Sequence, residues 1–332
     1  MALGEFEIID RFFRRPPHHD HGVRLGIGDD AALLELPPGS DLVAALDTIV
    51  AGRHFPEDAD ARSVGHRALA VNLSDLAAMG ATPAWALMGL TLREPEERWL
   101  GEFADGWFDL AGRHGVELVG GDTTSGPLTV SVQLSGWVER GTALRRSGGR
   151  PGDLLVVTGT LGDAAAGLAI ASGNLRADAP ADEKGARAAT SFRSELRHRF
   201  EYPEPRVEFG RLARGLATAA MDLSDGIAGD LPKLAMASGV AARVAVDRLP
   251  LSPALRSLVP QEKARHWALS GGDDYELLLS VPSGRLADLL AAAGQCQLKL
   301  SQIGELCAGS GVTWSMDGRP LEGHPAGYEH FR

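Results

Sequence analysis

The chain has 332 residues, of which 44% are hydrophobic and 23% are charged. This composition is ordinary for a globular protein and excludes disordered, collagen-like and coiled-coil chains. Because domains average about 150 residues, the length predicts two domains. The formal net charge of -11 argues against broad nucleic-acid binding, because affinity for nucleic-acid phosphates depends on clustered cations.

Residues 22–50 are predicted to form two strands next to an acidic loop. Residues 31–36 are a short apolar run, residues 37–39 favour a turn, and residues 42–46 give the second strand. We therefore expect Asp47 to lie at the end of a strand.

The segment 60–80 has the pattern of a helix that is apolar nearly all round. Asp75 lies at helical spacing among its apolar residues. Ionised carboxylates are rarely buried unless they are paired or bound to a metal, so Asp75 is the strongest single candidate for a functional residue. A hydrogen bond to Asn72 or to an arginine is the alternative interpretation.

A second helix is predicted up to Gly115, where glycine favours a helix end. Residues 116–119 then form a short strand that leads into the segment 120–122. Alternating apolar residues between 130 and 138 indicate a half-buried strand.

The polar segment 145–152 is rich in turn-forming residues, and we predict domains of residues 1–148 and 149–332 on either side of it. In the second domain, residues 154–170 read as strand, loop and helix. Residues 171–203 are rich in alanine and charge without a sustained period, which indicates a surface excursion.

Further along, residues 218–221 form a strand that leads into the acidic segment 222–226, and a helix follows up to Gly239. Strands and helices are mixed in both halves of the chain. The predicted fold class is therefore α/β (α+β).

The two cysteines, Cys296 and Cys307, do not form a CxxC pair, which disfavours a disulfide framework and a thiolate zinc site. The first residues lack the basic region and apolar core of a signal peptide. No apolar run approaches the roughly 18 residues that a transmembrane helix needs. We expect a cytoplasmic protein without a membrane partner.

Four short acidic segments close apolar runs along the chain. They are residues 28–30, 120–122, 222–225 and 271–274. A single acidic turn is usually only a solvated turn. Together with Asp47 and Asp75, however, these carboxylates would need several divalent cations if they converged, and oxygen ligands beside glycine suit Mg²⁺. The residues therefore indicate an Mg²⁺-dependent enzyme that handles a phosphorylated nucleotide.

Other phosphate-binding patterns are weaker. Residues 26–31 formally fit a GxGxxA dinucleotide fingerprint, but a strand pattern follows them where a helix is required, and Asp29 and Asp30 would repel phosphates. The chain has no GxxxxGK[ST] loop. Arg145 and Arg146 are either solvated linker charges or, beside a metal-rich site, partners for a phosphate chain.

Seven motifs, in order along nearly the whole chain, resemble the thiamine-monophosphate kinase family. They are residues 26–31, 47–55, 72–81, 120–124, 146–148, 222–226 and 270–277. That family makes thiamine diphosphate from thiamine phosphate and ATP. The resemblance implies a two-domain aminoimidazole ribonucleotide synthetase-like fold with mixed sheets and flanking helices, Mg²⁺ as cofactor, ATP as co-substrate, and a homodimer that pairs the N-terminal sheets.

The same motifs imply roles for individual residues. The implied Mg²⁺ ligands are Asp30, Asp47, Asp75, Asp122 and Asp222, with Asp225 a further one. The implied ATP contacts are Gly121, Asp122, Arg146 and Ser224, and the implied thiamine phosphate contacts are His54, Asp273 and Tyr328. Those with a catalytic role would be Asp30, Asp75, Asp122, Arg146 and Asp222. The attacking phosphate oxygen is already anionic, so catalysis would consist of in-line positioning and charge stabilisation without a general base.

Three residues depart from the family pattern. Ala45 and Leu46 stand where the family often has Ser-Thr, so any metal contact there would use backbone oxygen. Asp273 stands where glutamate is frequent, which shortens its reach by one methylene.

Two alternative functions remain open. One is a sister ATP-dependent enzyme, a selenophosphate or amide-activating synthetase, and the other is a noncatalytic cation-binding dimeric scaffold. The chain lacks the N-terminal cysteine or the cysteine tail expected of such sisters. Arg146, Ser224 and the complete acidic set argue against a scaffold.

Overall fold

The computed structural model describes residues 3–15, 22–175, 183–321 and 325–328. The contacts between residues divide the chain into two compact units. Unit 1 comprises Met1–Leu76 and Ala81–Ala143, and unit 2 comprises Ala77–Gly80 and Leu144–Arg332. The domain boundary between residues 148 and 149 stays a prediction.

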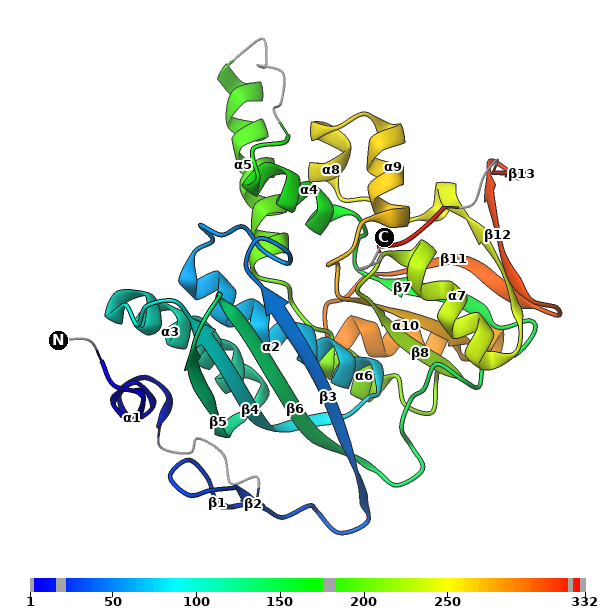
Figure 1. The fold of residues 1–332 in the computed structure, drawn as a ribbon. Helices are drawn as coiled ribbons and strands as arrows, with labels where there is room; N and C mark the ends of the chain where they lie inside the picture. Colours follow the sequence, from blue (N-terminus) through cyan, green and yellow to red (C-terminus); the bar gives the residue numbers. More distant parts are fainter. Residues whose placement is uncertain (1–2, 16–21, 176–182, 322–324, 329–332) are drawn as a thin grey trace. The chain divides into compact units, whose positions relative to one another are not determined.

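Unit 1 is built on a four-stranded mixed sheet with the strand order β3-β6-β4-β5. Its strands are β3 (Ser40–Val50), β4 (Thr82–Leu92), β5 (Glu117–Ser125) and β6 (Thr129–Glu139). β6 pairs antiparallel with β3 and β4, whereas β4 and β5 are parallel. Helices α2 (Ala61–Ala78) and α3 (Glu97–His114) cover one face of this sheet (Figure 1).

Glycines allow α2 and α3 to pack closely. A Cβ at Gly65 would lie 2.0 Å from the main-chain oxygen of Phe103, and a Cβ at Gly106 would lie 1.9 Å from that of Arg62. Every residue of α2 from 63 to 74 is buried. The prediction of a helix that is apolar nearly all round is therefore confirmed.

The chain begins with short elements. Helix α1 (Glu5–Ile8) continues into the π-helix η1 (Ile9–Phe13), and β1 (Val23–Leu25) pairs antiparallel with β2 (Leu33–Leu34). The predicted strand 31–36 is thus reduced to two residues, and the predicted strand 42–46 is only the middle of β3. β3 is longer because it pairs with β6 along its whole length, which a local pattern cannot show.

Unit 2 contains a seven-stranded sheet with the order β13-β12-β9-β11-β7-β10-β8. The strands are β7 (Leu154–Thr158), β8 (Ala219–Leu223), β9 (Ala241–Ala245), β10 (Glu276–Val281), β11 (Leu300–Cys307), β12 (Gly311–Met316) and β13 (Arg319–Pro320). Neighbouring strands are antiparallel except for β12 and β9. Every residue of β10 is buried, so this strand lies in the core.

The helices of unit 2 flank this sheet. They are α4 (Asp163–Ala171), α5 (Glu183–Glu201), α6 (Val207–Leu212), α7 (Ile227–Ser238), α8 (Pro253–Leu258), α9 (Gln261–Ser270) and α10 (Leu286–Gln295), with 3-10 turns η2 (Val246–Arg248) and η3 (Ser283–Arg285). Two mixed sheets with flanking helices confirm the predicted fold class. No helix in the described parts of the chain is long and apolar enough to cross a membrane.

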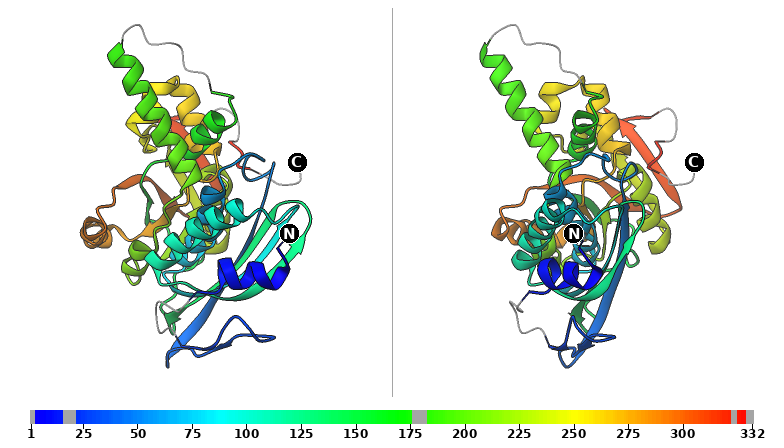
Figure 2. Two further views of the ribbon diagram at one scale, coloured as in Figure 1. Left: turned by 90° about the vertical axis from the view of Figure 1, so that its left-hand side faces the viewer. Right: turned by 60° about the vertical axis from the view of Figure 1, so that its left-hand side comes forward.

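The segment 171–203 lies at the surface as predicted, since most of its described side chains are exposed or half-buried, but most of it is helical. It contains α5, which runs beside α4 in both views of Figure 2. Leu196 of α5 is fully buried in a cluster with Ala166 of α4 and Leu255 of α8. Leu255 lies far from α5 along the chain, so the sequence pattern of the segment does not show this packing. Residues 176–182 lie outside the described residues.

Candidate active site

A pocket of about 860 Å³ in unit 1 brings two of the predicted acidic segments together. Residues 28–30 and 120–122 both line it. Asp30 and Asp122 are exposed, and neither forms an ion pair within the described residues. No group of three or more His, Cys, Asp or Glu residues in that part of the chain could hold a metal alone. The carboxylates of Asp30 and Asp122 could hold a metal ion only together with oxygen atoms of a ligand.

Gly121 is required by the close pairing of β4 and β5. Its φ angle is +149°, and a Cβ would lie 2.0 Å from the main-chain oxygen of Met88. The segment 120–122 lies inside β5, so the prediction that the strand ends at residue 119 is wrong. The parallel pairing with β4 extends the strand to Ser125.

Arg14 lines the same pocket, and the sequence motifs do not predict it as a site residue. Its guanidinium donates a hydrogen bond to the carbonyl oxygen of Ile27 at 2.9 Å and pairs with Asp10 at 2.7 Å. Arg14 follows the π-helix η1, and no motif marks it. The structure thus adds a cation beside the acidic segment 28–30.

Asn72 ties strand β3 to helix α2 between two predicted metal ligands. Its Oδ1 accepts the N–H of Asp47 at 3.0 Å, and its Nδ2 donates to the carbonyl oxygen of Ala68 at 3.2 Å. Asn72 is fully buried, and the half-buried Asp75 follows it on the same helix. Asp47 does not end its strand as predicted, because β3 stays paired up to Val50.

His54 lies in the turn after β3. Its Nδ1 accepts the N–H of Val50 at 3.0 Å, which fixes the orientation of the imidazole ring. Unit 1 thus holds half of the predicted site residues. These are Asp30, Asp47, His54, Asp75, Gly121 and Asp122.

In unit 2, the segment 222–226 joins β8 to α7. Asp222 lies within β8 and is buried, so the strand does not end at residue 221 as predicted. After it, Asp230 of α7 accepts the N–H of Ser224 at 3.0 Å and the N–H of Asp225 at 2.9 Å through one oxygen. This buried carboxylate therefore fixes the path of the main chain after Asp222.

Lys233 completes this arrangement. Its Nζ donates to Asp225 at 2.7 Å and to Asp230 at 3.0 Å. Burial lowers the pKa of Lys233, but its hydrogen bonds to the two carboxylates outweigh burial and raise the pKa above its ordinary value. Lys233 is thus an ammonium ion that is held between two carboxylates.

Two of the predicted thiamine phosphate contacts lie against the segment 222–226. The N–H of Asp273 donates to the carbonyl oxygen of Ser224 at 2.9 Å, and the N–H of Tyr328 donates to that of Asp225 at 3.1 Å. The hydroxyl group of Tyr275 donates to the carboxylate of Asp273 at 3.0 Å. The structure thus brings Asp273 and Tyr328 together with Ser224 and Asp225.

Arg146 lies beside β8, the strand that contains Asp222. The neighbouring Arg145 accepts the N–H of Ala220 in β8 at 2.9 Å through its carbonyl oxygen. The carbonyl oxygen of Arg146 accepts the hydroxyl of Ser238 at 2.8 Å, and its side chain is exposed. The main chain is therefore fixed while the guanidinium is accessible to a ligand.

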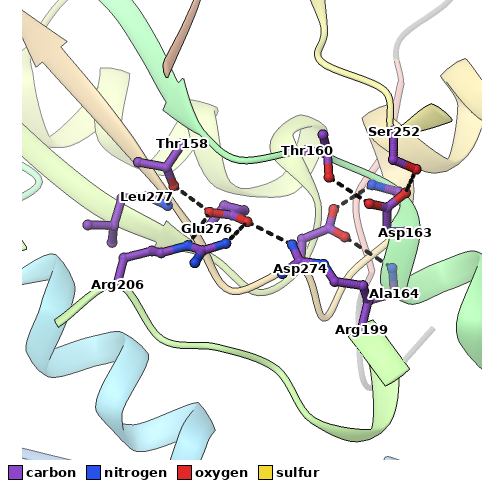
Figure 3. A network of polar contacts seen from close by, with 11 residues as sticks. Thr158, Thr160, Asp163, Ala164, Arg199, Arg206, Ser252, Asp274, Glu276 and Leu277 are labelled. Atoms are coloured by element: carbon purple, nitrogen blue, oxygen red, sulfur yellow. Dashed lines mark hydrogen bonds and ion pairs between the residues drawn. The ribbon is translucent and has the colours of Figure 1, made fainter. Parts of the chain in front are cut away.

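A buried polar network follows Asp273 in the chain, and no local sequence pattern predicts it (Figure 3). Glu276 has no exposed surface and pairs with Arg206 at 2.5 Å and with Arg199 at 2.8 Å. Burial raises the pKa of Glu276, but the two guanidinium groups outweigh burial and hold the pKa below its ordinary value.

Asp274 lies in the same network at the N-terminus of α4. It accepts the N–H of Gly162 at 2.7 Å and that of Ala164 at 3.3 Å (Figure 3). Burial raises the pKa of Asp274 well above its ordinary value. Asp163 beside it accepts hydroxyl hydrogen bonds from Thr160 and Ser252 at 2.6 Å. The network anchors the chain between Asp273 and β10.

Comparison with known protein families shows the class of protein to which this chain belongs. Residues 28–138 match the family described as AIR synthase related protein, N-terminal domain, and residues 150–316 match its C-terminal domain. The two units therefore have the fold of AIR synthase-related proteins.

Proteins that are similar to this chain over its full length show the family to which it belongs. The chain is 45% identical to the thiamine-monophosphate kinase of Escherichia coli (strain K12) over 332 residues, which covers 100% of this chain and 99% of that protein. A crystal structure of the thiamine-monophosphate kinase from Stenotrophomonas maltophilia K279a is 45% identical, with a TM-score of 0.85 over 97% of this chain and 99% of that chain. The chain belongs to the thiamine-monophosphate kinase family.

One related structure carries ligands. It is described as AaThiL complexed with AMPPCP and TMP, is 33% identical, and covers 92% of this chain and 92% of that chain with a TM-score of 0.75. A nucleotide analogue and TMP therefore bind to a protein of closely similar fold.

Proposed function

We propose that this chain transfers the terminal phosphoryl group of ATP to thiamine phosphate and forms thiamine diphosphate. The observation that carries this proposal is the 45% identity to a thiamine-monophosphate kinase over the whole chain. The ligands named for the related structure, AMPPCP and TMP, support the same pair of substrates. The pocket beside Asp30 and Asp122 gives unit 1 a place for phosphate groups.

The proposed Mg²⁺ ligands are carboxylates, and their hard oxygen atoms fit this ion. They are Asp30, Asp47, Asp75, Asp122 and Asp222. When bound, Mg²⁺ would neutralise phosphate charge and lower the repulsion between donor and acceptor. The hydrogen bond from Asp47 to Asn72 supports this set, because it fixes β3 beside the helix that carries Asp75.

The proposed contacts to ATP are Gly121, Asp122, Arg146 and Ser224. Gly121 leaves β5 without a side chain where the pocket approaches it. The exposed guanidinium of Arg146 can bind phosphate oxygens through two parallel hydrogen bonds. Asp230 fixes the main chain at Ser224.

The proposed contacts to thiamine phosphate are His54, Asp273 and Tyr328. The carboxylate of Asp273 complements the positive charge of the thiamine ring, and the Tyr275 hydroxyl holds this carboxylate in place. No general base is needed, because the attacking phosphate oxygen is anionic at neutral pH. The chain's own residues therefore act by positioning the two substrates in line and by stabilising charge.

We also propose that the chain is a homodimer formed through the sheet of unit 1. Leu46 and Leu87 pair with the same β6 residue, Gln133, and so lie on one face of the sheet. Leu42, Leu46 and Leu87 are 55%, 64% and 41% exposed. Such an apolar face suits a second copy of the same sheet.

A turnover assay tests the proposed activity. Purified protein with ATP and Mg²⁺ is expected to convert thiamine phosphate to thiamine diphosphate and to leave free thiamine largely unchanged, as measured by chromatography of the products. Asp75→Asn is expected to lower kcat at least about 100-fold, because loss of one charge-stabilising group commonly costs about 2.7–4 kcal/mol.

The matched control is Asp58→Asn, which removes an exposed aspartate of unit 1 outside the pocket and is expected to keep full turnover. Circular dichroism of each variant checks folding. Phosphorylation of thiamine without any reaction of thiamine phosphate would contradict the proposal.

A further inference from the structure

Lys233 lies beside Asp225 where a metal ion would be expected from the family resemblance. Its Nζ is 2.7 Å from Asp225 Oδ2 and 3.0 Å from Asp230 Oδ1. Asp230 and Lys233 are three residues apart on α7 and so lie on the same helix face, and Asp225 precedes the helix. One ammonium group therefore bridges the implied metal ligand and a buried carboxylate.

The charges at Asp225 nearly balance without a metal. Two carboxylates contact one ammonium group, and Asp230 also accepts the main-chain N–H groups of Ser224 and Asp225. These groups lie at the N-terminus of α7, where the helix dipole adds about half a positive charge. A divalent cation at the same oxygen of Asp225 would lie within a few ångströms of the ammonium group and would be repelled.

The implied ligands Asp30 and Asp122, which line the pocket of unit 1, differ from Asp225 in this respect. Asp30 and Asp122 are exposed and form no ion pair among the residues that the structure describes. Asp225 is only 30% exposed in its side chain and already has its cation. Asp30 and Asp122 are therefore accessible to a metal ion, whereas Asp225 is already paired with Lys233.

The residue type supports the same conclusion. The chain has only four lysines among its 33 Lys and Arg residues, and they are Lys184, Lys233, Lys263 and Lys299. The ammonium group of lysine is a compact, strongly hydrated point charge, whereas guanidinium is planar and delocalised. A lysine therefore resembles a small metal ion more closely than the arginines that supply most of the positive charge.

We propose that Lys233 is a built-in cation that replaces a Mg²⁺ ion at Asp225 in this chain. This inference rests on the proposed kinase function and removes Asp225 from the ligand set that the family resemblance implies. Asp225, Asp230 and Lys233 become positioning residues that hold the main chain of residues 222–226, while Asp222 remains a metal ligand. The charge at Asp225 is then independent of the concentration of free Mg²⁺.

Counting bound metal ions tests this assignment. Mn²⁺ serves as the probe, and the number bound per chain in the presence of AMPPCP is measured by electron paramagnetic resonance. We expect Asp225→Asn to bind as many Mn²⁺ ions as the wild type, because no metal is lost. We expect Lys233→Met to bind one more, because Asp225 is then free to hold it.

Two further variants keep the test specific. Lys233→Arg preserves the positive charge and is expected to bind as many Mn²⁺ ions as the wild type. Lys263→Met removes the same charge from α9, where Lys263 lies 4.7 Å from the ring of Trp267, and is also expected to leave the number unchanged. Thermal melts of all variants show whether each one folds.

The Mg²⁺ concentration that turnover requires gives an independent test of the proposal. Lys233→Met is expected to need a several-fold higher Mg²⁺ concentration for half-maximal rate, since it must fill a position that the ammonium group filled before. If Lys233→Met needed less Mg²⁺ than the wild type, Lys233 would only compete with a metal ion for Asp225, and the proposal would be overturned. Loss of one Mn²⁺ in Asp225→Asn, or an unchanged number in Lys233→Met, would overturn it as well.

Failure of this inference is distinguishable from failure of the proposed function. Wild-type conversion of thiamine phosphate decides the function without reference to Lys233. The number of bound Mn²⁺ ions is measured without turnover. A wild type that makes thiamine diphosphate while Asp225→Asn loses an ion would leave the kinase in place and remove only the role of Lys233.

Discussion

Asp273 and Tyr275 have φ angles of 72° and 49°, a region that costs non-glycine residues about 1–3 kcal/mol each. Three contacts stabilise this backbone. The two N–H groups donate to the carbonyl oxygens of Ser224 and Leu223 at 2.9 Å, and the Tyr275 hydroxyl donates to Asp273 at 3.0 Å. A carboxylate that is held in a strained conformation at a fixed orientation suits substrate recognition better than a purely structural role.

At this scale we predict that Asp273→Asn mainly raises the KM for thiamine phosphate. The rise should be about tenfold or more with little change in kcat, because hydrogen bonds to charged groups contribute about 1.5–3 kcal/mol and this contact would be equal in ground state and transition state. Tyr275→Phe should shift the same constant by a smaller factor. Steady-state kinetics with each substrate varied in turn measures both effects.

The KM for ATP is the internal control, and it should stay constant in both variants. A large fall in kcat with an unchanged KM for thiamine phosphate would place Asp273 at the reacting phosphates instead.

At the scale of elements, the buried network fixes β10 to the helices of unit 2. Glu276, the first residue of β10, pairs with Arg199 of α5 and with Arg206, which precedes α6. Asp274 caps α4 through the N–H groups of Gly162 and Ala164. The elements around the segment 270–276 are therefore held by ionic contacts in addition to apolar packing.

The lowered pKa of Glu276 determines how the stability of the fold changes with pH. Its pKa is below the ordinary value in the folded protein, so ionised Glu276 stabilises the fold above that ordinary value, and this contribution is lost as the pH falls through the lowered pKa. Asp274 has a raised pKa, so its contribution has the opposite sign and is lost as the pH rises through the raised value.

We predict that Arg206→Met destabilises the protein by about 3–5 kcal/mol near neutral pH, because it leaves a buried carboxylate with one of its two partners. The loss of unfolding free energy should become smaller as the pH falls, because loss of one guanidinium partner raises the pKa of Glu276 and favours its protonation in the variant. Urea unfolding at several pH values measures this trend.

Arg197→Met is the matched control, since Arg197 forms an i,i+4 pair with Glu201 on α5 and is 54% exposed. Its cost should be about 1 kcal/mol or less. An equal cost for both variants, or a cost for Arg206→Met that does not change with pH, would contradict the role given to the buried pair.

At the scale of the whole molecule, the sheet of unit 1 has one face covered by α2 and α3 and another that bears exposed leucines. Leu46, at 64%, is the most exposed large apolar residue of β3, and its neighbour Asp47 points to the opposite face because side chains alternate along a strand. Leu46 therefore belongs to the apolar face, while Asp47 belongs to the face that contacts α2. The departure from the family pattern at Leu46 places an apolar residue where an interface is proposed.

We predict that Leu46→Asp converts a dimer into monomers. A charge in the centre of an apolar interface would be buried without a partner, which is strongly unfavourable. Light scattering coupled to size-exclusion chromatography measures the mass. Met236→Asp adds the same charge at an 80% exposed position of α7 in unit 2 and should leave the mass unchanged. A wild type that is monomeric at all concentrations would contradict the proposal.

Local patterns determined much of the fold and most of the candidate residues. The helix 61–78 follows from its apolar residues, and the first part of β8, up to Met221, follows from a short apolar run. The family motifs identified Asp30, Asp122 and Arg146, whose roles stay predictions. Such features were accessible because periodicity and motif spacing are properties of neighbouring residues.

Only the tertiary structure decided which distant residues meet. β3 extends to Val50 and β5 to Ser125 because they pair with strands elsewhere in the chain, and α5 is stable because its buried face packs on α4 and α8. Asn72 reaches Asp47 across 25 positions, and Arg206 reaches Glu276 across 70. Long-range hydrogen bonds and ion pairs of this kind leave no periodic trace in the sequence, so the partners that fix the site appear only when the chain is folded.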